Sequence, residues 1–284
     1  MSQEYRPTGF NVLPPVIKNL LIINGIFFLA TLIFQVKFHI DLTHYLGLHY
    51  FFASDFRPHQ IITYMFMHGG FAHLFFNMFA LWMFGNVLEN IWGPKKFLIY
   101  YVVCGLGAAL LHYTVHYFEI QPTLNVLNEY LLNPSLDKFQ TLFTEGYIKI
   151  ASPETARDLQ PLIDELKRNE MLGANAQALQ TSTDFVIKYK EVFLNEPVVV
   201  GASGSVFGLL LAFGMLFPNS LIYMYFFFPI KAKYFVILYG LIELFGAVNP
   251  SQSDNIAHYA HLGGMLFGFI LIKLWSKRKK QFYE

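Results

Sequence analysis

The sequence is poor in charge and in cysteine. Of its 284 residues only 14% are charged and one is a cysteine, whereas 55% are hydrophobic and 18% are aromatic. Soluble domains carry about 25% charged residues, so this composition is typical of a membrane protein. Intrinsic disorder is excluded because it requires low hydrophobicity and high net charge. With Cys104 alone, an intramolecular disulfide framework is excluded as well.

The sequence also has almost no net charge and no cleavage site typical of a signal peptide. The formal net charge is +1 and the basic residues form no outward stripe, so no nucleic-acid partner is expected. The first sixteen residues contain three prolines and lack the small-residue cleavage site of a signal peptide. We therefore expect the first apolar segment to stay in the protein as a membrane anchor.

Six apolar segments approach the length of about 20 residues that a helix needs to cross a bilayer. They are Asn19–Val36, Tyr64–Leu88, Phe97–Phe118, Val198–Phe217, Tyr234–Val248 and Asn255–Ile272. All six lack Lys and Arg, and Glu243 is their one carboxylate. A further apolar segment, Leu221–Ile230, is too short to cross and is expected to be extended or interfacial. The sequence thus predicts an all-α, polytopic membrane protein.

Basic residues set the orientation of these spans. They cluster after spans two, four and six, as Lys95-Lys96, Lys231 with Lys233, and Lys277 to Lys280. Because positive loops face the cytoplasm, both termini are predicted to be cytoplasmic. We expect a multi-pass protein of the cell membrane, most simply the bacterial cytoplasmic membrane.

The composition changes abruptly between Glu119 and Glu196. This stretch holds 12 of the 19 acidic and 7 of the 20 basic residues. Ser152-Pro153 predicts a helix start and Gly173 a stop, and a second helix is expected from about Asn175 to Phe193. The predicted domains are 1–118 (N-terminal segment and spans one to three), 119–196 (an extracytoplasmic helical insertion) and 197–284 (spans four to six and a basic cytoplasmic tail). Residues 1–118 and 197–284 together form one membrane domain.

Polar groups inside membrane spans are costly and therefore indicate function. They gather near the outer ends of three spans: His68, His73 and Asn77 in span two, Ser203 in span four, and His258 and His261 in span six. Small-residue pairs follow on the latter two spans, Gly204 with Gly208 and Gly264 with Gly268, and permit close helix packing.

If those two helix faces meet, Ser203 and His261 come within hydrogen-bond reach, as a serine nucleophile and its general base require. His73, Asn77 and the backbone N–H of Ser203 are then candidate donors to an oxyanion. Except for Asp254, no carboxylate lies near His261 in the sequence, so a dyad is expected instead of a triad. Glu243 has no evident partner. No metal or cofactor is expected.

Taken together, these motifs resemble those of the rhomboid family of intramembrane serine proteases. The resemblance covers Thr63–Lys96, Val200–Gly208 and Ala260–Gly268, and implies a six-helix rhomboid-like bundle of bacterial type with a long insertion between spans three and four. It also implies that Ser203 is the nucleophile, His261 the general base, and His73 and Asn77 the oxyanion donors of an acyl-enzyme reaction.

Further residues match the family in supporting positions. His68 belongs to the span-two histidine pattern, Gly201 and Gly204 flank the nucleophile, and Glu89 matches an acid with a structural role. Phe207 stands where some members have Tyr, so it can stack on His261 but offers no hydroxyl. A second departure is His59-Gln60, where many members carry a Trp-Arg pair.

The leading hypothesis is an endopeptidase that cleaves transmembrane or juxtamembrane segments of other membrane proteins. Its expected partners are the lipid bilayer and membrane-protein substrates with helix-destabilising segments, and its site is expected to open on the extracytoplasmic side. The alternative is a catalytically inactive rhomboid-like protein that binds membrane clients. A transporter is a third class, but it predicts inverted repeats, and the sequence has no evident internal repeat.

Overall fold

The structure is a computed structural model that describes residues 11–150, 153–196, 198–224, 228–249 and 257–280. Within these ranges β structure is limited to one two-stranded hairpin and an isolated bridge between Leu48 and Val199, which confirms the predicted all-α class. The chain divides into two compact units. The first comprises residues 1–48, 58–113 and 199–284, and the second comprises 49–57 and 114–198.

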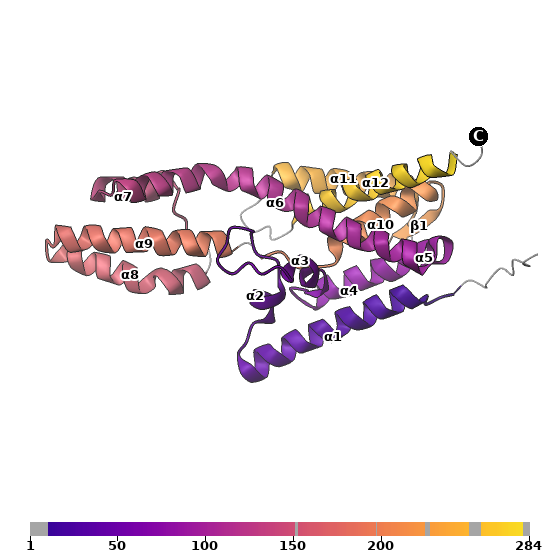
Figure 1. The fold of residues 1–284 in the computed structure, drawn as a ribbon, viewed down its shortest axis with the longest axis horizontal. Coiled ribbons are helices and arrows are strands. Elements are labelled where there is room, and N and C mark those ends of the chain that lie inside the picture. Colours follow the sequence, from indigo (N-terminus) through magenta and orange to yellow (C-terminus); the bar gives the residue numbers. More distant parts are fainter. Residues whose placement is uncertain (1–10, 151–152, 197, 225–227, 250–256, 281–284) are drawn as a thin grey trace, which may run out of the picture. The chain divides into compact units, whose positions relative to one another are not determined.

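The first unit carries most of the helices and strands, and Figure 1 labels most of them. Its elements are α1 (Pro15–Phe38), α2 (Leu42–Leu46), α3 (Gln60–Thr63), η1 (Tyr64–Phe66), α4 (Phe71–Ala80), η2 (Leu81–Gly85), α5 (Asn86–Trp92), the first part of α6 (Pro94–Leu132), α10 (Ser203–Leu216), β1 (Leu221–Met224), β2 (Phe228–Lys231), α11 (Ala232–Val248) and α12 (His258–Lys280). The antiparallel pairing of Leu221–Met224 with Phe228–Lys231 confirms the extended conformation predicted for this segment, within its described residues.

Four helical stretches are long and apolar enough to cross a membrane: Pro15–Phe38, Phe71–Trp92, Pro94–Leu132 and His258–Ser276. The polytopic membrane class is therefore confirmed. The other two predicted spans correspond to α10 and α11, whose 14 and 17 residues fall short of the usual spanning length of about 20. The count of six spans and the cytoplasmic termini stay predictions.

The second predicted span, Tyr64–Leu88, is not a single helix. Its chain is helical to Phe66, turns extended at Met67 and resumes as a helix at Phe71, after Gly69 and Gly70. Glycine costs about 1 kcal/mol relative to alanine inside a helix, so this pair favours a break. From Phe71 the helix continues through the π-turn η2 to Trp92. His68 therefore precedes the helix that carries His73 and Asn77.

Glycines set the contact between α10 and α12. A Cβ at Gly264 would overlap the backbone of Gly204, and one at Gly208 would lie 3.0 Å from the carbonyl oxygen of Gly264. The two backbones therefore touch directly, as the two small-residue pairs predicted. This contact holds the first turns of α10 and α12 together.

Glu89 links α5 to the start of α1. Its two carboxylate oxygens accept hydrogen bonds from the backbone N–H groups of Val16 and Ile17, each at 2.9 Å, and the side chain is buried. The first N–H groups of a helix lack intrahelical partners and carry partial positive charge, so a carboxylate stabilises them. The position is that of a structural brace for α1.

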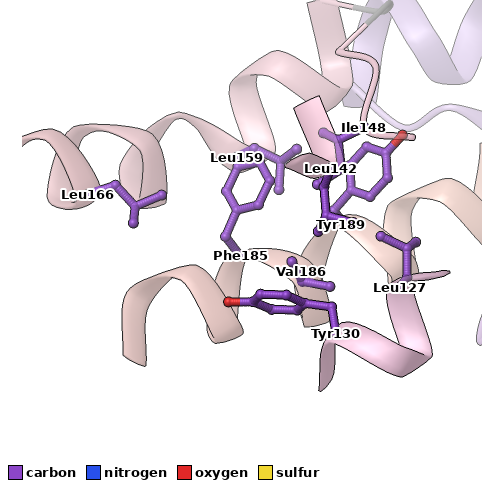
Figure 2. Packing of buried hydrophobic residues seen from close by; sticks show 9 residues of the cluster. All are labelled: Leu127, Tyr130, Leu142, Ile148, Leu159, Leu166, Phe185, Val186 and Tyr189. Atoms are coloured by element: carbon purple, nitrogen blue, oxygen red, sulfur yellow. The ribbon is translucent and has the colours of Figure 1, made fainter. Parts of the chain in front are cut away.

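The second unit comprises the end of α6, α7 (Leu136–Thr144), α8 (Pro153–Met171) and α9 (Asn175–Asn195). Figure 2 shows its core, to which Leu127, Tyr130, Leu142, Ile148, Leu159, Leu166, Phe185, Val186 and Tyr189 contribute. The two helices predicted for the insertion are confirmed, although the predicted cap Ser152 lies outside the described residues.

Two features of the second unit differ from the sequence-based expectation. Helix α6 was expected to end at Phe118 but continues past Pro122 to Leu132, where Leu127 and Tyr130 are buried in the core. Burial of these side chains outweighs the one backbone hydrogen bond that a proline removes. Helix α7 was not predicted. It is capped by Ser135, whose Oγ accepts from the N–H of Lys138 at 3.2 Å.

Candidate active site

Ser203 and His261 are hydrogen-bonded at the N-terminal ends of two helices of the first unit. Ser203 is the first residue of α10, and His261 lies in the first turn of α12. Ser203 Oγ and His261 Nε2 are 2.8 Å apart. Direct backbone contact between Gly204 and Gly264, one turn or less along each helix, brings the two side chains within reach of each other.

The imidazole of His261 is held in a fixed orientation by its neighbours. The ring of Phe207, one turn after Ser203 on α10, stacks on it with centroids 4.2 Å apart and planes 10° apart. The stacking predicted for Phe207 is therefore present. A stacked ring cannot tilt freely, so Nε2 stays directed at the serine.

The loop before Ser203 is anchored by backbone hydrogen bonds. Leu48 and Val199 exchange two of them, at 2.9 and 3.0 Å, and the N–H of Gly201 donates to the carbonyl of Tyr64 at 2.9 Å. Gly201 has φ +122°, a conformation that residues with a Cβ rarely adopt. A Cβ there would also lie 2.8 Å from His73 Nε2 and 3.5 Å from Ser203 Oγ. Both polar atoms therefore lie on the same side of Gly201.

His73 is positioned to donate from Nε2. Its Nδ1 accepts a long hydrogen bond, 3.4 Å, from the N–H of Gly69, and a neutral imidazole that accepts at Nδ1 carries its proton on Nε2. The ring of His68 lies edge-on against that of His73, with centroids 5.0 Å apart. Although His68 lies outside the helix, it still packs on the histidine of α4.

Asn77 is buried on the next turn of α4. Its Nδ2 donates to the carbonyl of His73 at 3.0 Å, which leaves one amide hydrogen for another acceptor.

Three other residues have partners away from the Ser203–His261 pair. The Oγ of Ser205 donates to the carbonyl of Tyr101 on α6 at 2.7 Å. Of the candidate residues, Glu89 is bound to the first turn of α1 and Gly204 lies in the α10–α12 contact.

Glu243 was not assigned to the site from the sequence, yet it lies beside His261. Its Oε2 is 2.8 Å from His261 Nδ1 and 2.7 Å from His258 Nδ1. The contact with His258 is a hydrogen bond, whereas that with His261 has ion-pair distance without hydrogen-bond alignment. Two signals were available in the sequence: Glu243 is the one carboxylate in the six apolar segments, and His258 and His261 share a helix face.

The described part of the chain contains one group of three side chains that could together hold a metal ion. Its members are Glu243, His258 and His261, whose donor atoms lie within 4.8 Å of one another. Two imidazoles and a carboxylate are a donor set that zinc accepts.

Comparison with known proteins gives one family. The model of the Rhomboid domain matches residues 55–120 and 176–278, more than half of the chain. An uncharacterized mitochondrial rhomboid protein of Schizosaccharomyces pombe is 27% identical over 230 residues, which are 77% of this chain and 52% of that protein. The chain therefore spans about half the length of this curated relative.

Two relatives named as rhomboid proteases match shorter stretches. GluP of Bacillus subtilis is 35% identical over 51 residues, 18% of this chain and 10% of GluP. AarA of Providencia stuartii is 39% identical over 56 residues, 20% of each chain. The family match leaves out residues 121–175, which belong to the second unit.

Proposed function

The chain belongs to the rhomboid family, and we propose that it is an intramembrane serine endopeptidase acting on other membrane proteins. The observation that carries the proposal is the 2.8 Å hydrogen bond between Ser203 Oγ and His261 Nε2, at the N-termini of two helices in direct backbone contact. A protein that only binds membrane clients requires neither a paired nucleophile nor its base.

In the proposed reaction Ser203 Oγ attacks the carbonyl carbon of the scissile peptide while His261 Nε2 takes the hydroxyl proton. The tetrahedral intermediate collapses to a serine ester, and His261 returns the proton to the leaving amine. Water, deprotonated by the same nitrogen, then attacks the ester carbonyl, and the C–O bond to Ser203 breaks as His261 returns that proton to Ser203 Oγ. These steps use only side chains of this protein and water.

The negative charge of the tetrahedral intermediate requires donors that are in place beforehand. We assign this role to His73 Nε2, to the second amide hydrogen of Asn77 and to the N–H of Ser203. Support comes from the position of His73 Nε2 beside Gly201 and from the start of α10 at Ser203, where backbone N–H groups lack helical partners.

We also propose an orientation and a domain division. Lys95 and Lys96 lie in the first turn of α6, and Lys231 and Lys233 lie at the start of α11. The backbone N–H of Lys233 donates to the carbonyl of Pro218, just beyond the end of α10 that is opposite to Ser203. With these lysines in the cytoplasm the site opens on the extracytoplasmic side of the cell membrane. Residues 1–118 and 197–284 form the rhomboid domain, and 119–196 form an accessory insertion, although the family match resumes at residue 176.

The test is the purified protein in liposomes with a single-span substrate, scored by fragment mass and by labelling with a fluorophosphonate probe. An active rhomboid protease yields two fragments and one labelled serine. An inactive client-binding protein retains the substrate but gives neither fragments nor label, and that result would overturn the proposal.

A further expectation concerns which membrane proteins are cleaved. A transmembrane helix hides its carbonyls in hydrogen bonds, and each one left unsatisfied in lipid costs several kcal/mol. Gly and Pro lower the cost of unwinding by about 1 and about 3 kcal/mol relative to Ala. We propose that substrates carry such residues near the outer end of their span, with a small residue before the cleaved bond, because Gly201 and Gly204 flank the nucleophile.

Replacing the Gly and Pro residues in the outer half of a cleaved substrate by Leu should lower the initial rate by about tenfold or more. Initial rates are measured in liposomes, and the same number of Leu substitutions in the inner half serves as the control. Equal rates for both variants would show that unwinding does not limit access to Ser203.

A further inference from the structure

We propose that Glu243 is a positioning residue for His261, so that Ser203, His261 and Glu243 act as a line of three groups instead of a dyad. This inference rests on the proposed protease function. It assigns a role to a residue of α11 for which neither the sequence nor the family match supplies one.

The geometry of the three groups carries the inference. Ser203 Oγ is 2.8 Å from Nε2 of His261, and Glu243 Oε2 is 2.8 Å from Nδ1 of the same ring. The two contacts are on opposite nitrogens, so the carboxylate lies behind the imidazole as seen from the serine. Phe207 stacks on the face of the ring and leaves both nitrogens open to these partners.

The burial of Glu243 requires an explanation. The residue is 6% exposed and lies on a helix that is otherwise almost wholly apolar. A carboxylate in such surroundings costs several kcal/mol unless hydrogen bonds and opposite charge compensate. The two imidazoles of α12 are the compensating groups in the described structure, and one of them belongs to the proposed general base.

A carboxylate at Nδ1 acts on the base in two ways. A neutral imidazole carries one proton, and His261 can accept from Ser203 only when that proton is on Nδ1. An acceptor beside Nδ1 favours this tautomer. Once His261 has taken the serine proton it is a cation, and the adjacent anion stabilises it.

His258 keeps the carboxylate in place. Its Nδ1 shares a hydrogen bond of 2.7 Å with the same Oε2 atom, and it lies three residues before His261 on one face of α12. The contact to His261 has the right distance but lacks hydrogen-bond alignment in the free protein. Such bonds commonly tighten when substrate binds.

A metal ion bridging Glu243, His258 and His261 is the competing interpretation. Zinc bonded at about 2.0–2.2 Å to three ligands holds the ligand atoms about 3.3–3.5 Å apart. The separations of 2.7 and 2.8 Å from Glu243 Oε2 to the two Nδ1 atoms are shorter and fit direct contacts between the side chains. The geometry therefore favours the positioning role.

The first test is kinetic and uses the full chain in liposomes. Glu243→Gln should lower kcat for a cleaved substrate by about 10- to 1,000-fold with KM changed less than about twofold, and Glu243→Asp should restore part of kcat. Glu89→Gln is the matched control, since Glu89 is also a buried carboxylate and it braces α1. It should lower thermal stability but leave kcat per folded molecule within about twofold.

The second test needs no variant of Glu243 and no turnover. In protein labelled with ¹⁵N at histidine, the ring signals of His261 are identified by their loss in His261→Ala. In samples that contain EDTA and no added metal, we expect His261 to be the tautomer that is protonated on Nδ1.

The outcomes separate the two proposals. Wild-type kcat in folded Glu243→Gln overturns the inference but leaves the protease. A His261 protonated on Nε2 overturns the inference and also removes the acceptor that Ser203 requires. If the protein neither cleaves substrate nor reacts with the fluorophosphonate probe, the proposed protease function is wrong. The tautomer of His261 still tests the contact with Glu243 in that case. If EDTA lowers activity and zinc restores it, the cluster is a metal site and the positioning role is wrong.

Discussion

Ser203→Ala should lower cleavage of a transmembrane substrate by about 10⁴-fold or more and abolish fluorophosphonate labelling, while the protein stays folded. The reason is that Ser203 Oγ is the hydroxyl bonded to His261 Nε2, at 2.8 Å. Without it no ester forms, and the oxyanion donors and the binding site supply what little rate is left. Turnover and labelling are both measured against wild-type protein in the same liposomes.

Ser205→Ala is the matched control for this variant. It removes a hydroxyl from the same helix, two residues away, where Oγ donates to the carbonyl of Tyr101 at 2.7 Å. The loss of that bond costs about 1 kcal/mol of stability and should leave turnover near normal. Retained activity in Ser203→Ala together with its loss in Ser205→Ala would show that the nucleophile is misassigned.

Gly264→Ala should disable the enzyme through a methyl group that touches no reacting atom. A Cβ at this position overlaps the carbonyl group of Gly204, and backbone cannot move aside as a flexible side chain can. Helices α10 and α12 must then separate, which costs about 1–3 kcal/mol or more in stability. His261 lies on α12 and moves with it, so the distance from His261 to Ser203 increases. A displacement of about 1 Å lowers the rate about 100-fold.

The measurement is kcat/KM and thermal unfolding of Gly264→Ala in one detergent. Gly25→Ala on α1 is the matched control, since a Cβ there has no neighbour within 4 Å, and its stability should stay within about 1 kcal/mol of wild type. Wild-type stability and turnover in Gly264→Ala would contradict the direct backbone contact from which the Ser203–His261 pairing follows.

The pairing of Ser203 with His261 was predictable because its causes are local in sequence. The two glycines of each small-residue pair are one helical turn apart, so each pair defines a helix face. Ser203 comes one residue before its pair and His261 three residues before its pair, so both lie close to those faces. Phe207 follows Ser203 by one turn, and its stacking follows from the same periodicity. The roles of these residues in catalysis stay proposals until the variants are measured.

Other features could not be obtained from sequence patterns. The apolar segment 64–88 predicts the length of a span but not the break inside it. That break depends on whether the backbone N–H and C=O groups at Gly69 and Gly70 find hydrogen-bond partners outside the helix. The end of α6 is set by burial of Leu127 and Tyr130 in a core of residues far along the chain. The position of Glu243 depends on how α11 is rotated against α12.

By itself the sequence determined the class of the protein, an all-α membrane protein, and the helix faces that carry Ser203, His73, Asn77 and His261. Composition, helical period and glycine spacing are properties of short stretches, and they persist whatever surrounds them. Tertiary structure alone decided that His68 precedes its helix, that Gly201 lies against His73, and that Glu243 contacts His261. These contacts join residues on separate elements, and packing of the whole unit fixes the rotation and offset of each helix against its neighbours.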